Sequence, residues 1–360
     1  MAIVDVLMPA YNAAATLREA IESLQAQTLK DIRIIVVNDG SKDETGAILD
    51  EMAAADARIV AAHKQNDGIV EARNTALSHA NAEFIACLDS DDIAFPDRLE
   101  STLAYLNAHP DCVAVGGAVA HMDEHGAPLS GLQQSGDPAA ANAAKAPALE
   151  PYIVQSTLMA RRADVVAVGG YRHVPNSEDS DLFWRLAERG ALVNLPDTLG
   201  KYRVHTASIS STLHNGRIMA LGSQLGALSA LRRRAGKADL AFPRALHEAL
   251  KQAPSLEAMV QIASADLEPE DVRHLRIATA CKLMELARYR PFEPDQADCA
   301  FIRAALPFAS ALTPQNKKEV GWYVTVTAAR LARKGMVLEA FALAPPQHYA
   351  IAAARFVSGR

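Results

Sequence analysis

Short apolar runs alternate with helical patterns through the first hundred residues, and this alternation limits the possible folds more than any other feature. Each run is followed by apolar residues at three-to-four spacing, as in Leu17, Ile21 and Leu24. That order is typical of βαβ units, which build a parallel sheet with helices on its faces. The predicted strands are Val4–Pro9, Ile32–Asn38, Ile59–His63 and Glu83–Asp89. The predicted helices between them are Ala15–Gln27, Glu44–Ala55 and Ile69–Ala80.

The alternation of strands and helices continues for one more helix and one more strand, and an irregular segment follows. Pro96 and Asp97 open a further predicted helix, and Cys112–Ala120 has the composition of another strand. Residues 126–151 are rich in Gly, Ala, Pro and Ser and show little periodicity, which predicts a long mobile loop. Loops of this length are usually functional lids or disordered inserts, and the sequence leaves both open.

The second part of the chain has a different character. Its helical patterns are rich in Ala, Leu and Arg and are separated by Pro or Gly, at Arg217–Ala235, Arg244–Gln252, Glu270–Arg290, Asp298–Ala311 and Lys317–Lys334. A chain of 360 residues suits one large or two ordinary domains. We therefore predict an α/β domain over residues 1–210 and an all-helical region over residues 211–360.

Charge divides the chain in the same way. Residues 1–210 carry 16 Lys and Arg against 29 Asp and Glu, whereas residues 211–360 carry 20 against 13. An acidic first part argues against nucleic-acid binding, and the basic second part is suited to an anionic lipid surface. Four scattered cysteines without a CxxC pair argue against a zinc site or a disulfide framework. With no apolar stretch of membrane-spanning length and no basic leader, we expect a cytoplasmic protein.

Three carboxylates directly follow the apolar run Phe84 to Leu88, in the sequence Asp89-Ser90-Asp91-Asp92. The carboxyl ends of parallel strands border the crevice in which open α/β sheets bind ligands. Acids crowded this closely need a compensating cation, and oxygen ligands suit Mg²⁺ or Mn²⁺. The alternative is an acidic turn that caps the next helix.

Two further clusters of polar residues, each taken by itself, have both a structural and a functional interpretation. Glu178, Asp179 and Asp181 precede an amphipathic helix, where acidic residues ordinarily stabilise the helix dipole. Asn38-Asp39-Gly40-Ser41 follows the second predicted strand, and Asp-Gly is a common turn.

Further motifs accompany these groups in a fixed order along the chain. The full set is Pro9-Ala10-Tyr11-Asn12, Val37 to Ser41, Gly68 to Asn74, Asp89 to Asp92, Met159 to Arg162, Gly169-Gly170-Tyr171, Glu178 to Leu182 and Tyr202-Arg203-Val204-His205. This ordered set closely resembles glycosyltransferase family 2, the inverting nucleotide-sugar enzymes with a GT-A fold. The resemblance covers about residues 3–210 and rests on the ordered set. It implies a Rossmann-like, mostly parallel sheet flanked by helices, and transfer of a sugar from a nucleoside diphosphate, above all UDP, to a hydroxyl of a surface glycan or glycolipid.

By this resemblance, four residues line the nucleobase pocket: Pro9, Tyr11, Asp39 and Arg73, with the Asp39 carboxylate able to accept the uracil N3–H. A core position for Tyr11 and a solvated one for Arg73 are the alternatives.

The resemblance also implies a divalent cation, Mn²⁺ or Mg²⁺, that neutralises the departing diphosphate. Asp91 is the expected metal ligand, and Asp89 is expected to contact the ribose or the water shell of the metal. Asp92 is assigned to the turn. His205 is either a second metal ligand or a structural histidine.

Inversion is a single displacement by an acceptor hydroxyl and needs one general base. The resemblance assigns that role to Asp179, with Glu178 orienting it or raising its basicity. Arg203 either pairs with the diphosphate or forms a salt bridge with the acidic helix. The segment Val154 to Arg162 departs from the family pattern, which affects the acceptor side of the site.

Two basic segments in the second part permit membrane contact. Arg232-Arg233-Arg234 ends a helical pattern before Gly236, where cations favour the helix C-terminus. Lys317 to Lys334 combines Trp322 and Tyr323 with basic residues, a pattern that fits either an interfacial helix or an ordinary core helix.

Two other functions are the alternatives to a glycosyltransferase. One is a nucleotide-binding module that has lost its chemistry and uses the helical region as an interaction surface, although Asp91 and Asp179 are both present. The other is a nucleotidyltransferase, which needs a glycine-rich basic loop after the first strand, and Pro9 to Ala15 contains neither glycine nor Lys or Arg.

Overall fold

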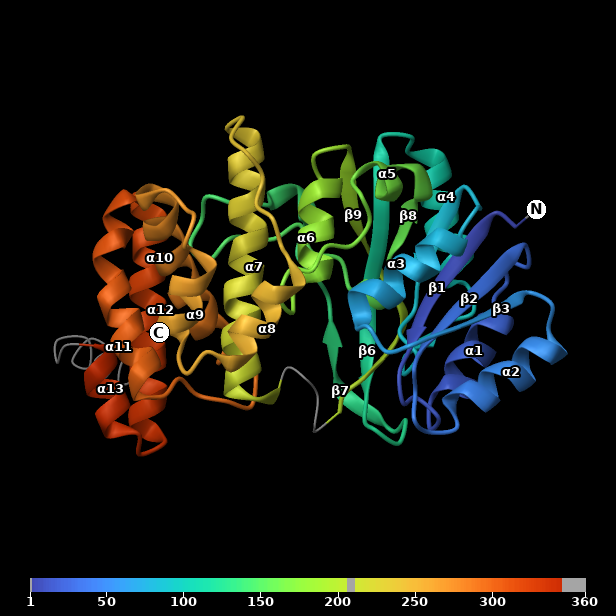
Figure 1. The fold of residues 1–360 in the computed structure, drawn as a ribbon, viewed down its shortest axis with the longest axis horizontal. Helices are drawn as coiled ribbons and strands as arrows, with labels where there is room; N and C mark the ends of the chain where they lie inside the picture. Colours follow the sequence, from blue (N-terminus) through green and yellow to red (C-terminus); the bar gives the residue numbers. More distant parts are fainter. Residues whose placement is uncertain (1, 206–210, 345–360) are drawn as a thin grey trace. The chain divides into compact units, whose positions relative to one another are not determined.

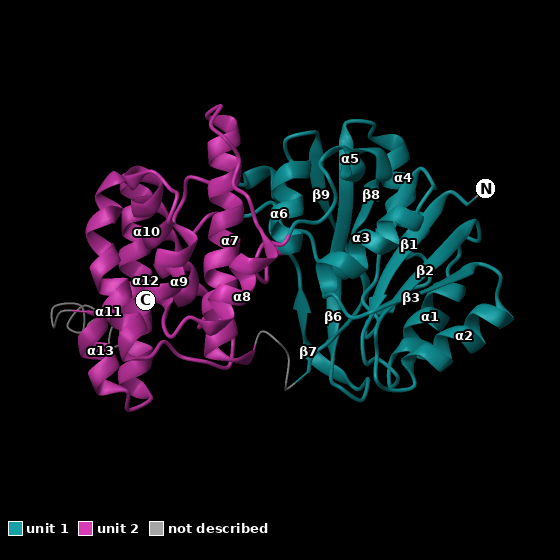
Figure 2. Ribbon diagram, in the orientation of Figure 1, with its two compact units in different colours: residues 1–141, 150–172, 178–206 teal, residues 142–149, 173–177, 207–360 magenta. Residues whose placement is uncertain are grey.

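The computed structural model describes residues 2–205 and 211–344, and its contacts divide the chain into two compact units (Figure 2). The first unit comprises residues 1–141, 150–172 and 178–206, and the second comprises residues 142–149, 173–177 and 207–360. The boundary predicted at residue 210 lies outside the described residues. Two interior segments that the sequence placed in the α/β domain therefore belong to the helical unit.

The first unit is built on a nine-stranded sheet in the order β3-β2-β1-β4-β8-β6-β9-β5, with β7 paired to β6 (Figure 1). The β1, β2, β3 and β4 strands are parallel neighbours, whereas β8 is antiparallel to both β4 and β6. The strands are β1 Val4–Ala10, β2 Ile32–Asp39, β3 Ile59–Lys64, β4 Phe84–Cys87, β5 Ile93–Ala94, β6 Cys112–Met122, β7 Pro128–Gln133, β8 Met159–Arg161 and β9 Ala191–Arg203.

Helices cover both faces of this sheet. The side chains of β1 alternate between the two faces, and every residue of this strand is therefore buried. Val6 and Met8 pack into one apolar cluster with α1 and α2, while Leu7 packs into the other with α3 and α6. The helices are α1 Leu17–Gln25, α2 Thr45–Ala55, α3 Ile69–His79, α4 Arg98–Ala108, α5 Arg162–Ala167 and α6 Glu178–Leu186. The predicted α/β sheet with flanking helices is confirmed.

The second unit is helical, as predicted. Its core joins α7 to α10 through buried side chains such as Leu221 and Leu225 on α7 and Met284 on α10. The helices are α7 Leu213–Arg234, α8 Arg244–Gln252, α9 Leu256–Ala263, α10 Pro269–Leu286, α11 Gln296–Ala305, α12 Pro314–Arg333 and α13 Val337–Leu343. None of the helices in the described ranges is both long and apolar enough to cross a bilayer.

Residues 126–151 are more ordered than the sequence suggested. They contain β7 and a short 3₁₀ turn at Pro138–Ala140, and the part that belongs to the helical unit is anchored there. The Asn316 side chain accepts a hydrogen bond from the Ala146 backbone N–H and donates one to its carbonyl, each at 2.8 Å, and Gln224 accepts from the Ala148 N–H. The expectation of a mobile loop is therefore wrong for residues 142–149, since specific side chains hold their backbone.

Candidate active site

Acidic residues gather where β4 ends, in the turn from Asp89 to Asp92. Asp92 is 1% exposed, and its Oδ1 accepts a hydrogen bond from the Arg203 backbone N–H at 2.9 Å. Burial and the charges of Asp89 and Asp91 raise the pKa of Asp92 well above its usual range. The Ser156 hydroxyl lies between two of these carboxylates, in hydrogen-bond contact with Asp92 and 3.2 Å from Oδ2 of Asp89. Asp92 thus holds the turn in place, as expected.

Asp91 and His205 form a pair beside this turn. Their side chains meet at 2.8 Å between Oδ2 and Nε2, and each is a little over one-third exposed. Burial and the neighbouring Asp89 raise the pKa of Asp91, against the opposing effect of His205. The structure thus brings together the two residues that the sequence nominated as metal ligands.

The donor set of this pair fits Mn²⁺ or Mg²⁺. Such ions are held in many proteins by one or two side chains, with substrate phosphates and water filling the other positions. Within residues 2–205 and 211–344, no group of three His, Cys, Asp or Glu side chains is placed to hold a metal ion. A cation at Asp91 and His205 would therefore take its other ligands from substrate phosphates and water.

Arg203 is buried and fully engaged. Its guanidinium pairs with Glu19 at 2.7 Å and donates from Nε to the Asp91 carbonyl at 2.8 Å. The salt bridge that the sequence left open thus exists, with a partner on α1 rather than on the acidic helix. Contact with a diphosphate would have to compete with these bonds or use the remaining guanidinium N–H groups.

Arg73 links the acidic turn to the start of α6. Its guanidinium is 2.7 Å from Oε1 of Glu178 and 3.3 Å from Oδ1 of Asp89, and it stacks on the Tyr171 ring at 5.4 Å. Arg73 is 7% exposed, so it is not the solvated residue of the alternative interpretation. The structure places it between two acidic groups of the site.

Asp179 lies next to Glu178 in the first turn of α6. Burial and the Glu178 charge raise the pKa of Asp179 to about 6, although the charge of Arg73 opposes the shift. Its Oδ1 accepts from the Ser180 N–H at 2.7 Å, and its Oδ2 accepts from the Tyr152 hydroxyl at 3.2 Å. A carboxylate with a pKa near neutrality can take up a proton at physiological pH, as a general base must.

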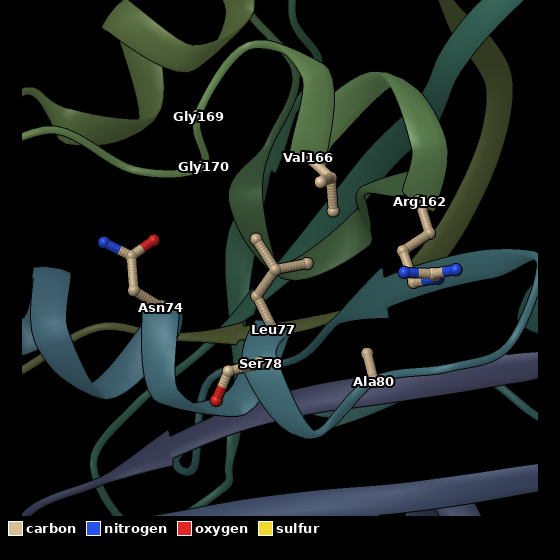
Figure 3. Close-up of a pocket in the computed structure, with 8 residues that line it drawn as sticks. All are labelled: Asn74, Leu77, Ser78, Ala80, Arg162, Val166, Gly169 and Gly170. Atoms are coloured by element: carbon tan, nitrogen blue, oxygen red, sulfur yellow. The ribbon is translucent and has the colours of Figure 1, made fainter.

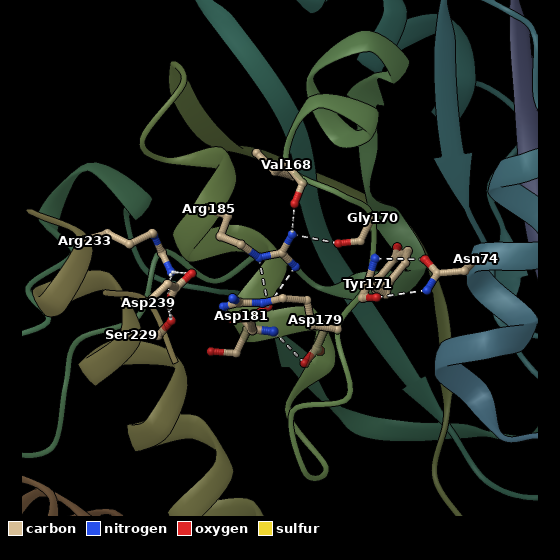
Figure 4. Close-up of polar contacts among 12 residues, drawn as sticks. Asn74, Val168, Gly170, Tyr171, Asp179, Asp181, Arg185, Ser229, Arg233 and Asp239 are labelled. Atoms are coloured by element: carbon tan, nitrogen blue, oxygen red, sulfur yellow. Dashed lines mark hydrogen bonds and ion pairs between the residues drawn. The ribbon is translucent and has the colours of Figure 1, made fainter. Parts of the chain in front are cut away.

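The loop that leads into α6 is held by a separate set of polar contacts (Figure 4). Arg185 donates to Asp181 at 2.9 Å and to the carbonyls of Val168 and Gly170, each at 2.7 Å. Asn74 donates to the Tyr171 carbonyl and accepts from its N–H, each at 2.9 Å. Asp181 is therefore structural, and these contacts fix where α6 begins.

The residues that the resemblance assigns to the nucleobase pocket include Pro9 in β1, Tyr11 just after it and Asp39 at the end of β2. The Asp39 carboxylate is 3% exposed and accepts from Lys64 Nζ at 2.8 Å, from the Asn66 side chain at 3.2 Å and from the backbone N–H groups of Asp67 and Gly68. These four donors occupy its lone pairs, so a base N–H must share or displace one of them.

The neighbouring residues differ in accessibility. Pro9 is buried within β1, while Tyr11 is 50% exposed and so is not the core aromatic of the alternative interpretation. Gly40 has φ +70, and an added Cβ would lie 2.5 Å from the Asn66 nitrogen, so only glycine fits this turn.

Sequence reasoning missed Ser156, Tyr152 and Lys64. The first two lie in an irregular segment around a 3₁₀ turn at Gln155–Thr157, where no periodicity marks them. Lys64 follows the third predicted strand directly, and its position at that strand end was the available signal.

A shallow pocket of about 370 Å³ lies elsewhere on this unit (Figure 3). It is lined by Asn74, Leu77, Ser78, Ala80, Arg162, Val166, Gly169 and Gly170. None of the predicted site residues lines it, so the acidic edge described above remains the candidate site.

Comparison with solved structures identifies the fold class. A mannosyltransferase from Pyrobaculum calidifontis, in complex with GDP-Man and Mn²⁺, matches with a TM-score of 0.53 at 17% identity, over 99% of this chain and 88% of that one. Residues 1–349 of S. aureus TarS, in complex with UDP-GlcNAc, match with a TM-score of 0.51 at 17% identity, over 93% and 92%. The fold is therefore that of GT-A glycosyltransferases, as predicted.

Sequence comparison gives the family. Residues 5–167 match the model described as Glycosyl transferase family 2. The putative glycosyltransferase EpsE of Bacillus subtilis (strain 168) is 34% identical over 215 residues, 56% of this chain and 72% of that protein. The amylovoran biosynthesis glycosyltransferase AmsE of Erwinia amylovora is 32% identical over 204 residues, 55% and 75%. The chain belongs to glycosyltransferase family 2.

Proposed function

We propose that this glycosyltransferase is metal-dependent and inverting, and that it moves a hexosyl group from a nucleoside diphosphate sugar, foremost a UDP-sugar, to a hydroxyl of a surface glycan or glycolipid. The observation that carries the proposal is the placement of Asp179, whose pKa is about 6, directly after Glu178. Arg73 pairs with both Glu178 and Asp89 and so connects Asp179 to the acidic turn. A proton acceptor and the acidic turn thus belong to one connected site. The kinship to a glycosyltransferase of amylovoran biosynthesis supports a polysaccharide acceptor.

In this mechanism Asp179 accepts the proton of the acceptor hydroxyl. The hydroxyl oxygen bonds to the anomeric carbon while the bond from that carbon to the diphosphate oxygen breaks, and the electron pair leaves on the nucleoside diphosphate. One displacement inverts the anomeric centre. A divalent cation held by Asp91 and His205 would supply positive charge to the leaving diphosphate.

The remaining residues bind the donor. Pro9, Tyr11 and Asp39 border the nucleobase position, and Asp89 faces the ribose. Arg73 lies between Asp89 and Glu178 in the structure, so we assign it to the sugar and diphosphate side rather than to the base alone. Arg203 keeps the acidic turn folded.

We also propose that the protein is cytoplasmic and touches an anionic membrane peripherally. In α7, Arg232 pairs with Asp271 and Arg233 pairs with Asp239, which leaves α12 as the better contact. There Lys317 and Lys318 are exposed, and Trp322 lies one turn beyond Lys318 with 46% of its surface exposed.

The test is to incubate the protein with UDP-, GDP- and dTDP-sugars plus Mn²⁺ and to measure release of the nucleoside diphosphate with and without a glycan acceptor. Asp179→Asn should lower transfer by about 10² to 10⁴-fold, the usual contribution of a general base, while leaving donor affinity unchanged. Asp197→Asn, an exposed carboxylate on β9, is the matched control. Normal transfer by Asp179→Asn would remove Asp179 from the role of base. Donor binding without turnover in the parent protein would support the inactive nucleotide-binding module instead.

A further inference from the structure

The segment that precedes the 3₁₀ turn at Gln155–Thr157 approaches Asp179 with two polar side chains, and neither is accounted for by the proposed mechanism. Tyr152 donates from its hydroxyl to Oδ2 of Asp179 at 3.2 Å. Glu150 accepts from the Ser180 hydroxyl at 2.5 Å, and its charge acts on Asp179. Both side chains therefore act on the carboxylate that we assign as the base.

The Tyr152 ring is held so that its hydroxyl has a fixed direction. The ring packs edge-on against the fully buried Phe183, with centroids 5.6 Å apart and planes at 88°. The Tyr152 carbonyl accepts a hydrogen bond from the Asn194 side chain at 2.9 Å. These two contacts restrict the Tyr152 ring and backbone, so its hydroxyl donates to Asp179 with little further loss of side-chain freedom.

We propose that Tyr152 and Glu150 are positioning residues for Asp179. The Tyr152 hydroxyl holds the ionised carboxylate in place, and the negative charge of Glu150 disfavours ionisation of that carboxylate. Both carboxylate oxygens then accept a hydrogen bond, because Oδ1 already accepts from the Ser180 N–H at 2.7 Å. The importance of these hydrogen bonds for sugar transfer rests on the proposed function of Asp179.

The groups that face Asp179 come from several elements. Glu178 lies beside it on α6, Arg73 reaches it from α3, and Tyr202 of β9 acts on Tyr152. Burial and the adjacent Asp179 raise the pKa of the Tyr152 hydroxyl well above its usual value, so this hydroxyl stays protonated and donates. A hydrogen bond to the charged form of an acid favours that form, and a nearby like charge disfavours it.

Two variants therefore have opposite expected effects. Tyr152→Phe keeps the ring and its packing on Phe183 but removes the donor, so the pKa of Asp179 should rise by about one unit. Glu150→Gln removes a negative charge and keeps an oxygen that accepts from Ser180, so the pKa of Asp179 should fall. General loosening of the fold would not give shifts of opposite sign.

The experiment is a carbon-13 NMR titration of the full chain labelled at its aspartate carboxyl carbons, without substrate. Asp179→Asn assigns the Asp179 signal, and Tyr105→Phe is the matched control, because Tyr105 packs against the apolar cluster on the other face of the sheet. We expect a higher midpoint in Tyr152→Phe, a lower one in Glu150→Gln and no change in Tyr105→Phe. An unchanged or lowered midpoint in Tyr152→Phe would overturn the role of Tyr152. If that variant does not fold, an unchanged or raised midpoint in Glu150→Gln would overturn the proposal.

Donor turnover across pH gives the catalytic readout. With the pKa of Asp179 moved up by about one unit, turnover by Tyr152→Phe at pH 6 should fall about fivefold relative to the parent and recover above pH 8. A loss of equal size at every pH would indicate a merely structural role for Tyr152 and count against the proposal. A protein that cleaves no nucleotide sugar would refute the proposed function. Since the titration needs no substrate, it would still test whether Tyr152 and Glu150 act on the Asp179 carboxylate.

Discussion

Asp179, which we propose as the general base, shows at the scale of one residue how a buried carboxylate can lower stability. Its pKa in the folded protein is about 6, above the 3.8 expected for an exposed aspartate, so the folded state binds more protons than the unfolded state between these values. The free energy of unfolding therefore falls as the pH rises from about 4 to about 6. Above that range the ionised carboxylate is retained at a cost in stability.

Asp179→Asn should for this reason be more stable than the parent at pH 7.5, by about 3 kcal/mol, and nearly equal to it at pH 4. Urea unfolding at the two pH values measures the difference, with the exposed Asp197→Asn as control. A variant as stable as the parent, or less stable, at pH 7.5 would show that ionised Asp179 does not lower the free energy of unfolding.

At the scale of elements, the segment 142–149 depends on a few side chains of the helical unit. Asn316 makes two hydrogen bonds of 2.8 Å with Ala146, whose side chain is buried in the helical core. Asn316→Ala should lower the free energy of unfolding by about 1–3 kcal/mol, because both backbone groups of Ala146 lose their partner. The exposed Gln315→Ala on the same helix is the control in thermal unfolding. Equal stability of the two variants would mean that the segment is held by other contacts.

The elements that the sequence predicted well are those with a strong local pattern. The parallel strands β1 to β4 were predicted because their apolar runs are long enough to be recognised beside periodic helices. The three-residue β8 lies between β4 and β6 and was not predicted, because so short a strand is defined by its neighbours rather than by its own pattern. The assignment of 142–149 to the helical unit depends in the same way on Asn316, 170 residues from Ala146 along the chain.

The same distinction applies to the site. Asp89 and Asp91 were predicted because they directly follow a strand whose end is marked in the sequence. Tyr152 and Ser156 act on Asp179 and Asp92 from an irregular segment, and only the folded chain brings them there. Arg73 was predicted near the nucleobase, and the structure adds the pairing with Asp89 and Glu178.

At the scale of the whole molecule, residues 211–360 carry an excess of 20 basic over 13 acidic residues, and some of these basic side chains form ion pairs within the helical region. Figure 4 shows Arg233 bound to Asp239 and Ser229, and Arg232 pairs with Asp271. These ion pairs leave the excess of positive charge unchanged, but they engage two of the arginines at the end of α7. The exposed Lys317 and Lys318 on α12, near Trp322, are the positive groups that we propose for membrane contact.

Vesicle co-sedimentation tests this contact. The full chain should bind vesicles with anionic lipid more strongly than neutral ones, and Lys317→Glu with Lys318→Glu should weaken binding about tenfold or more, at about 1 kcal/mol per lysine near the surface. Lys251→Glu with Arg244→Glu, an equal charge change at two exposed sites on α8, is the control. Equal binding to neutral and anionic vesicles, or an effect of the control as large as that of the pair, would exclude α12 as the contact.

The central claim is that the acidic edge of the first unit binds a nucleoside diphosphate together with a divalent cation. The most direct measurement is calorimetric titration with UDP, GDP, TDP and CMP, each with Mn²⁺ and with chelator, in the parent protein and in Asp91→Ala. We predict binding of one diphosphate that requires Mn²⁺ and is lost in Asp91→Ala, because Asp91 and His205 are the side chains placed to hold the cation. Binding that survives both the chelator and the substitution would contradict the metal site, and binding of none of the four nucleotides would contradict the account of the donor pocket.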